Sequence, residues 1–172
     1  MAFNKIGSLV PYGGPILRHE ILANSITVVQ FDSVKFASGF AALGTAGASV
    51  LGHVVGIETN LGVGVNTTGA AGAEMGSFVG TFATASDNQT VANVRGIIDV
   101  SQMTIYSAEV DATIGTTTGS NLRGYRMDLV DANTLDESTA VTTTAQYATL
   151  GLDPTDTARS ACYIFESQIF NT

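Results

Sequence analysis

Five side chains with oxygen ligands lie close together between residues 128 and 137, and they are the strongest candidates for metal chemistry. They are Asp128, Asp131, Asn133, Asp136 and Glu137. Carboxylate and amide oxygens are the ligands that Ca²⁺ prefers. The EF-hand pattern fails, because a loop starting at Asp131 has Asp136 where glycine is needed and Thr142 where a bidentate glutamate is needed. We therefore interpret the segment as a solvated acidic loop and predict neither a metal nor a cofactor.

The sequence contains no complete motif for phosphate binding, for a nucleophilic serine or for a zinc site. Neither Lys5 nor Lys35 follows a glycine, so the sequence contains no phosphate-binding loop of the P-loop type. The GxSxG motif that presents a nucleophilic serine is missing as well. His19, His53 and Cys162 are too few and too far apart in sequence for a local zinc site. We therefore predict that the protein has no catalytic residues and is not an enzyme.

His53 and Cys162 both lie in segments that read as strands. A lone histidine inside a strand is more often hydrogen-bonded within the fold or at an interface than it is a catalytic base. Cys162 lies in SACYIFES, where alternation places it on the same face as Ile164 and opposite Tyr163. A single cysteine cannot form an intramolecular disulfide. We predict a structural histidine and a buried, inert thiol.

The net charge of −8 and the scattering of the basic residues argue against nucleic acid and membranes as partners. No Lys or Arg occurs between Phe36 and Val94. Phosphate groups and anionic lipids are both bound by clustered Lys and Arg. The uncharged stretch 36–57 contains five glycines together with Ser, Thr and His53, so we interpret it as a β hairpin rather than a membrane span.

Short apolar runs separated by turn residues predict an all-β fold. Residues 26–31 alternate as a strand does, and residues 39–43, 44–47 and 50–57 read as a strand–turn–strand unit. Further strands are expected within 75–85, 91–100, 102–114 and 160–170, with Tyr106, Ala108, Val110 and Ala112 on one face. We predict a single compact β-barrel or sandwich over residues 25–172. Residues 1–24, with Pro11, two glycines and Pro15, are expected to form an extended N-terminal arm.

One set of residues in this body resembles a known family. A strand ending in Asp32-x-Val34-Lys35 is followed by Gly39-Phe40-Ala41, a short turn, and Val50-x-Gly52-x-Val54-x-Gly56-Ile57. This arrangement resembles the core of tailed-bacteriophage capsid decoration (cement) proteins, over roughly residues 25–170. The resemblance implies a structural virion protein on the outer capsid surface, made in the host cytoplasm. It also implies a homotrimer that binds several major capsid proteins and stabilises the shell.

The apolar residues of the arm are the expected capsid contacts. Ile16 and Leu17 need a partner surface, and Lys5 and Arg18 make the arm slightly basic on a strongly acidic body. We therefore expect capsid contacts at Pro11, Tyr12, Ile16, Leu17 and Arg18. Two alternatives remain open, a tail, baseplate or fibre component of the virion and a glycan- or receptor-binding β module.

Overall fold

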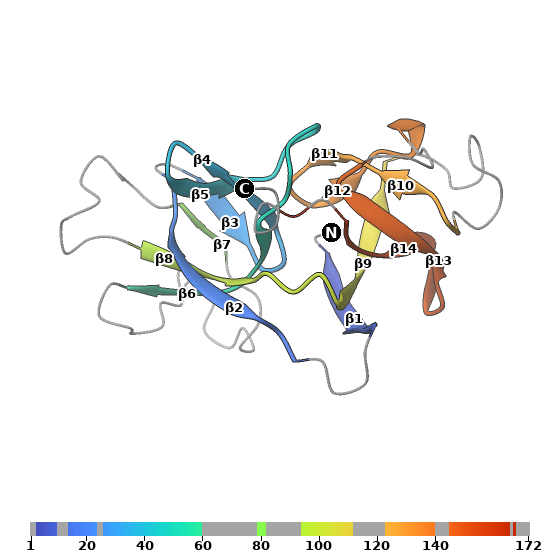
Figure 1. Ribbon diagram of the computed structural model, residues 1–172, viewed down its shortest axis with the longest axis horizontal. Coiled ribbons are helices and arrows are strands. Elements are labelled where there is room, and N and C mark those ends of the chain that lie inside the picture. The colour runs from blue at the N-terminus through green and yellow to red at the C-terminus, as the bar shows by residue number, and fades with distance from the viewer. Residues whose placement is uncertain are drawn as a thin grey trace.

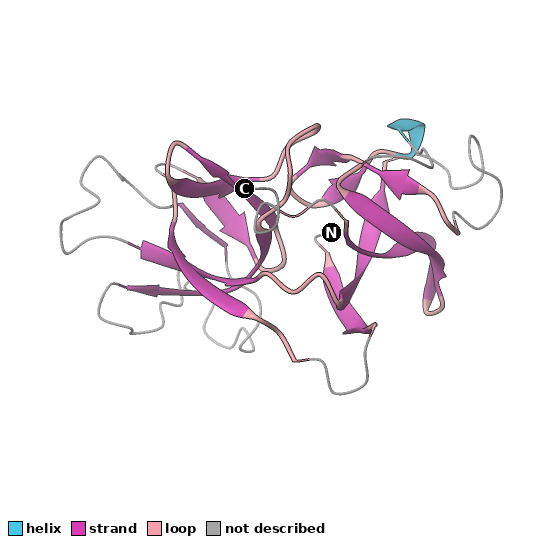
Figure 2. Cartoon of the chain, viewed as in Figure 1, coloured by secondary structure: helices cyan, strands magenta, loops and turns pink. Residues whose placement is uncertain are grey.

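The computed structural model describes residues 3–9, 14–23, 26–59, 79–81, 94–111, 123–139, 145–165 and 167. Within these ranges the chain is nearly all β, with one short 3-10 helix, η1 (Glu137–Thr139), and three sheets (Figure 2). The two larger sheets lie side by side along the long axis of the molecule. The five-stranded sheet, which we call sheet B, lies on the left in Figure 1, and the seven-stranded sheet, sheet A, lies on the right. The predicted all-β fold is confirmed.

Sheet A has seven strands and curves into a nearly closed barrel. Its strands are β1 (Asn4–Ser8), β9 (Thr104–Val110), β10 (Arg126–Met127), β11 (Leu129–Asp131), β12 (Thr134–Leu135), β13 (Tyr147–Asp153) and β14 (Asp156–Ile164). Six of these strands follow the order β10-β13-β14-β9-β12-β11, and β1 lies off this path. One edge of β9 pairs with β14. Along its other edge, the first half of β9 pairs with β1 and the second half pairs with β12. The central position of β9 therefore makes it the strand on which sheet A is organised.

Sheet B has five strands and is built largely from the first half of the chain. Its strands are β2 (Leu17–Ile21), β4 (Ser33–Ala37), β5 (Phe40–Leu43), β6 (Gly52–Thr59) and β8 (Val94–Asp99), in the order β2-β8-β6-β4-β5. The third sheet is the pair β3 (Thr27–Val29) and β7 (Val79–Thr81). Residues 100–103 connect β8 of sheet B directly to β9 of sheet A, so this corner joins the two large sheets.

The sequence predicted a hairpin between the strands that are now β5 and β6, but the structure has its hairpin between β4 and β5. Strands β4 and β5 are joined by Ser38 and Gly39, whose φ angles of 51° and 85° lie in the left-handed region. Two such residues close a tight hairpin, since their twist matches that of the strands. Strand β6 pairs with the other edge of β4. The strands expected within 39–43 and 50–57 are present as β5 and β6, but β4 lies between them in the sheet.

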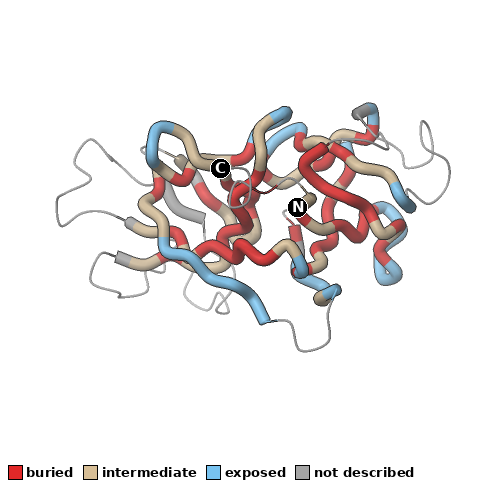
Figure 3. The backbone as a smooth tube through the Cα atoms, viewed as in Figure 1, coloured by how far each residue is buried: buried red, intermediate tan, exposed pale blue. Residues whose placement is uncertain are grey.

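Each large sheet has its own apolar core, and the buried residues form the red segments in Figure 3. The core of sheet A consists of Phe3, Val50, Tyr106, Ala108, Val110, Met127, Leu129, Leu135, Tyr147, Cys162 and Ile164. The core of sheet B consists of Leu22, Val28, Val34, Ala41, Leu51, Val54, Ile57, Ile98 and Val100. The predicted inward faces of β9 and β14 are confirmed. Burial raises the pKa of the Cys162 thiol, which keeps it protonated and inert.

The described parts of the N-terminal segment are extended and contribute one strand to each large sheet. Strand β1 pairs antiparallel with β9 in sheet A, and β2 pairs antiparallel with β8 in sheet B. Phe3, just before β1, is fully buried among the aromatic rings of sheet A. Residues 4–8 and 17–21 therefore belong to different sheets.

Candidate functional site

Three of the five predicted contact residues lie at the start of β2, and all three are exposed. Ile16 and Leu17 are exposed apolar side chains. The guanidinium of Arg18 forms an ion pair of 2.6 Å with Glu20, and its side chain is also exposed. Pro11 and Tyr12 lie outside the described residues, so their predicted contacts stay predictions. The start of β2 thus exposes two apolar residues and one ion-paired arginine, and their capsid contacts likewise stay predictions.

The position of these residues is set by the pairing of β2 with β8. The amide of Val100 donates to the carbonyl of Ile16 at 2.8 Å, and Leu17 stands opposite Asp99 in the antiparallel register. Strand β2 is the terminal strand in the order of sheet B. An edge strand presents backbone groups that an extended partner can pair with.

Three further exposed apolar side chains, Ile6, Leu9 and Met103, lie on β1, just after it, and at the corner between β8 and β9. The amide of Leu9 donates to the carbonyl of Met103 at 2.7 Å, which joins the end of β1 to the corner between β8 and β9. Together with Ile16 and Leu17 these residues form what we call the corner surface, each with 39% to 61% of its area exposed. In Figure 1 the end of β1 and the start of β2 lie on the same side of the molecule as that corner. Exposed apolar area is a feature of interaction sites when it is contiguous. Ile16 and Leu17 are successive residues of an extended segment, so their side chains point to opposite faces.

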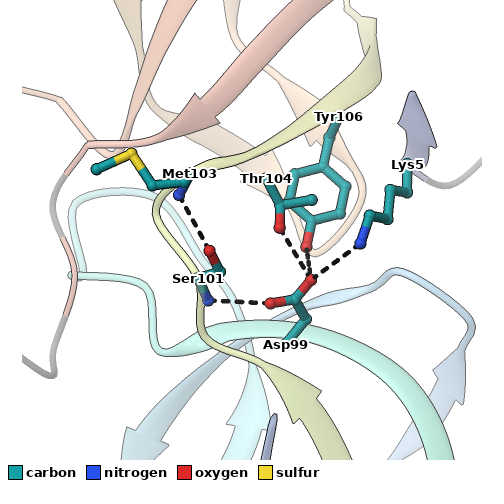
Figure 4. A network of polar contacts seen from close by, with 6 residues as sticks. All are labelled: Lys5, Asp99, Ser101, Met103, Thr104 and Tyr106. Carbon is teal, nitrogen blue, oxygen red and sulfur yellow. Dashed lines mark hydrogen bonds and ion pairs between the residues drawn. The ribbon is translucent and has the colours of Figure 1, made fainter. Parts of the chain in front are cut away.

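The carboxylate of Asp99 is buried next to the corner and accepts hydrogen bonds from residues of the turn and of β9 (Figure 4). Its Oδ1 accepts the amide of Ser101 at 3.0 Å, and its Oδ2 accepts the hydroxyls of Thr104 at 3.0 Å and Tyr106 at 3.2 Å. The hydroxyl of Ser101 in turn accepts the amide of Met103 at 3.2 Å. The carboxylate therefore fixes the turn that holds Met103 at the surface.

Two basic residues lie near the corner surface, and each is paired with an acid. Lys5 of β1 lies 3.8 Å from Asp99 and its side chain is partly exposed, while Arg18 of β2 is paired with Glu20. The chain as a whole has a net charge of −8. The exposed apolar side chains are therefore the main feature that a partner would meet at this surface.

A second cluster of polar groups is buried where the two sheets meet, around His53 of β6. Its Nδ1 lies 2.8 Å from the carbonyl oxygen of Phe31, and its Nε2 lies 3.0 Å from the hydroxyl of Tyr147. The Tyr147 hydroxyl also lies 2.9 Å from Oγ of Ser33. His53, Ser33 and Tyr147 are fully buried, so no substrate reaches them in this conformation. The prediction of a structural, hydrogen-bonded histidine is confirmed.

The acidic segment 128–137 uses its carboxylates to hold backbone amides. Asp131 accepts the amide of Asn133 at 3.0 Å, and Asp136 accepts the amide of Ser138 at 2.9 Å. Asp128 accepts the amide of Gln146 at 3.2 Å. Across the described ranges, no three His, Cys, Asp or Glu side chains are grouped so that they could hold a metal ion.

Sequence reasoning identified only part of the corner surface. Ile16 and Leu17 are consecutive apolar residues with no local partner, which is a signal that a sequence can show. Ile6, Leu9 and Met103 join them only through the pairing of β1 with β9, and no local pattern indicates that pairing.

Comparison of the chain with protein-family models, with curated proteins and with solved structures found no match. Among the described residues no helix is long and apolar enough to cross a membrane.

Proposed function

We propose that the protein is a structural, non-enzymatic virion component that decorates the outer surface of a tailed-phage capsid. In this proposal it binds major capsid proteins as a homotrimer and stabilises the shell. The observation that supports the proposal best is the corner surface, where five exposed apolar side chains lie beside Lys5 and Arg18. In this proposal the buried hydrogen-bonded clusters around Asp99 and His53 stabilise the fold and do not take part in binding.

The composition of the corner surface suits a contact repeated many times. Burial of apolar area stabilises a contact by about 25 cal/mol per Å². Exposed Ile16, Leu17 and Met103 offer such area without a deep pocket. A modest affinity per copy is sufficient when a multimer engages several sites on one shell at once.

The charge of the protein fits the outside of a capsid. With a net charge of −8 it has little attraction for packaged or free nucleic acid. Lys5 and Arg18 are each paired with an acid, Asp99 and Glu20, so the corner surface is largely apolar. The proposed contact therefore rests on apolar burial and leaves the remaining acidic surface in solvent.

The edge of β2 supports self-association. Strand β2 ends the order of sheet B, and just after β2 the chain is already linked to β5 through the bridge between Leu22 and Ala41. A closed oligomer would cover the first part of the β2 edge, which otherwise invites uncontrolled pairing. A trimer built by one repeated contact closes on itself and leaves equivalent surfaces facing the shell. The mass of the protein in solution tests this part of the proposal separately from capsid binding.

Co-sedimentation with cognate capsids tests the proposal. The wild-type protein is expected to pellet with capsids, and the double variant Ile16→Ser with Leu17→Ser is expected to lose about tenfold or more in apparent affinity. The matched control is Val130→Ser, which removes an exposed apolar side chain on β11, outside the corner surface.

Two results would contradict the proposal. The first is a wild-type protein that stays in the supernatant at every capsid concentration, or that binds purified tails instead. The second is a Val130→Ser variant that loses as much binding as the double variant. Binding on a glycan array would favour the recognition module, although Tyr106 and Tyr147 are buried and cannot form its aromatic platform.

A further inference from the structure

Strand β1 is attached to sheet A through a single neighbouring strand. It lies off the strand order β10-β13-β14-β9-β12-β11 and, among the described strands, pairs with β9 alone (Figure 1). Lys5 and Ile6 of β1 are exposed, and so is Leu9 just after it. The pairing of β9 with β14 and of β14 with β13 therefore does not depend on whether β1 comes from the same chain or from another copy.

Phe3, just before β1, is the residue that anchors this segment in the fold. Its side chain is fully buried. Its ring centroid lies 5.2 Å from that of Tyr147, 6.2 Å from that of Tyr106 and 4.6 Å from that of His53. Removal of a buried phenylalanine side chain is among the costliest core substitutions. The slot that these three rings line is therefore stable only when it holds a Phe3 side chain.

The linker between β1 and β2 begins and ends at the same corner of the protein. The amide of Leu9 donates to the carbonyl of Met103 at 2.7 Å. The amide of Val100 donates to the carbonyl of Ile16 at 2.8 Å. The chain from residue 9 to residue 16, when extended, reaches up to about 25 Å. Since each end is fixed by its own hydrogen bond, the linker has that reach for crossing to the corner of a neighbouring copy.

The placement of β1 is independent of the pairing of β2. Pro11 and Pro15 lie between the two strands, and neither has an amide hydrogen to donate to a β ladder. The strands themselves pair with β9 of sheet A and with β8 of sheet B. Strand β2 therefore keeps its place in sheet B when β1 enters sheet A of another copy.

We propose that Phe3 and β1 of each copy fill the slot beside β9 of the next copy in the oligomer. This inference rests on the homotrimer of the proposed function and names the contact that holds it together. The occupant is a second copy because its segment has the same sequence, so it makes the same hydrogen bonds with β9 and the same ring contacts around Phe3. In a closed ring each copy gives one segment and receives one, so every slot is filled.

A disulfide across the pairing of β1 with β9 tests the proposal in the full chain. Gly7 and Ile105 stand opposite each other in the antiparallel register. Opposed Cα atoms lie about 4.5–5.5 Å apart, which a disulfide can bridge. A Cβ at Gly7 would lie 3.7 Å from Cδ1 of Ile105, so there is room for the double variant Gly7→Cys with Ile105→Cys. The native Cys162 is buried and does not compete.

The mass of the oxidised double variant, measured after denaturation without reductant, distinguishes the two arrangements. Exchange predicts covalent trimers as the main product, both from the protein in solution and from protein pelleted with capsids. Single-chain products from a protein whose native mass is that of a trimer would overturn the exchange and leave the homotrimer standing. A native mass of one chain, free and on capsids, would overturn both. Covalent trimers that do not bind capsids would support the exchange and contradict only the capsid contact.

The hairpin of β4 and β5 supplies the matched control. Lys35 and Ala42 stand opposite each other in its register, and only Ser38 and Gly39 join the two strands. The double variant Lys35→Cys with Ala42→Cys should therefore give single-chain products alone. Covalent trimers in equal amount from this control would overturn the assignment of the cross-link to exchange.

The wild-type protein gives the same answer if the double variant does not fold. Chains labelled with carbon-13 are mixed with unlabelled chains, and the mixture is unfolded and refolded. Exchange predicts nuclear Overhauser contacts between the ring of Phe3 in one copy and the ring of Tyr147 in another, which packs against it. Contacts between these rings that are found only within one chain would refute the exchange.

Discussion

The Nε2 of His53 and the hydroxyl of Tyr147 are hydrogen-bonded at 3.0 Å, which links β6 of sheet B to β13 of sheet A inside the protein. The Tyr147 hydroxyl reaches Ser33 of β4 as well, at 2.9 Å. Strands from two sheets therefore share one buried polar cluster. Such a cluster is stable only when each member has its partner, so single substitutions in it are informative.

We expect Tyr147→Phe to lower the free energy of unfolding by roughly 1–3 kcal/mol, the usual cost of a buried acceptor without a donor. The substitution keeps the ring that packs against Phe3 but removes the donor to His53. Urea denaturation measures the effect. Tyr163→Phe, on the neighbouring strand with a partly exposed ring, is the matched control and should change the midpoint little. Equal effects of the two variants would contradict this account of the cluster.

The stability of the protein between pH 7 and pH 4 should show two opposing titrations. Burial lowers the pKa of His53 to about 4, so its contribution is complete above its unfolded value of 6.5 and is lost as the pH falls through 4. Burial raises the pKa of Asp32 to about 6, so its contribution is complete below its unfolded value of 3.8 and is lost as the pH rises through 6. Urea midpoints at several pH values should therefore change little in this range.

Single substitutions should separate these two contributions. His53→Gln leaves only the Asp32 term, so the stability of this variant should rise as the pH falls from 7 to 4. Asp32→Asn leaves only the His53 term, which amounts to roughly 3 kcal/mol for the shift in its pKa. This variant should lose stability steeply over the same range, and parallel pH profiles for the two variants would show that other groups dominate.

The buried carboxylate of Asp99 should contribute much more to stability than its ion pair suggests. Asp99→Ala leaves the donors of Ser101, Thr104 and Tyr106 without their acceptor, and we expect a loss of about 3 kcal/mol. Lys5→Met removes only a partly exposed partner at 3.8 Å and should cost less than about 1 kcal/mol. Thermal melts compare the two variants, and a larger effect of Lys5→Met would show that the ion pair is the dominant interaction.

Gly52 should not tolerate a side chain, because its backbone lies against β8. A Cβ added at Gly52 would overlap the carbonyl oxygen of Asp99 and would lie 2.7 Å from Cγ2 of Ile98. Since backbone atoms cannot rotate away, we expect Gly52→Ala to cost about 3 kcal/mol, the upper end for overpacking. Gly14→Ala is the control, because its Cβ would meet no atom within 4 Å. Similar urea midpoints for the two variants would refute the close approach.

Several features of the fold followed from the sequence alone, because they depend on alternation along a strand. Tyr106, Ala108 and Val110 point into one core as predicted, and so do Cys162 and Ile164. Successive side chains of a strand point to opposite faces, so the pattern of apolar residues shows the buried face before any partner strand is known. The small number of Lys and Arg residues and their scattering along the chain are also visible in the sequence alone, and they argue against nucleic acid as a partner.

Only the tertiary structure decided which strands are neighbours, and with them both candidate regions. The corner surface requires β1 to pair with β9 so that Leu9 meets Met103, and the buried cluster requires His53 and Tyr147 to face each other across two sheets. The hairpin predicted between residues 40 and 57 was wrong for the same reason, since β4 lies between its strands. Alternation is a local property of the chain, whereas strand order depends on how distant segments bury their apolar faces together, and no short stretch of sequence contains that information.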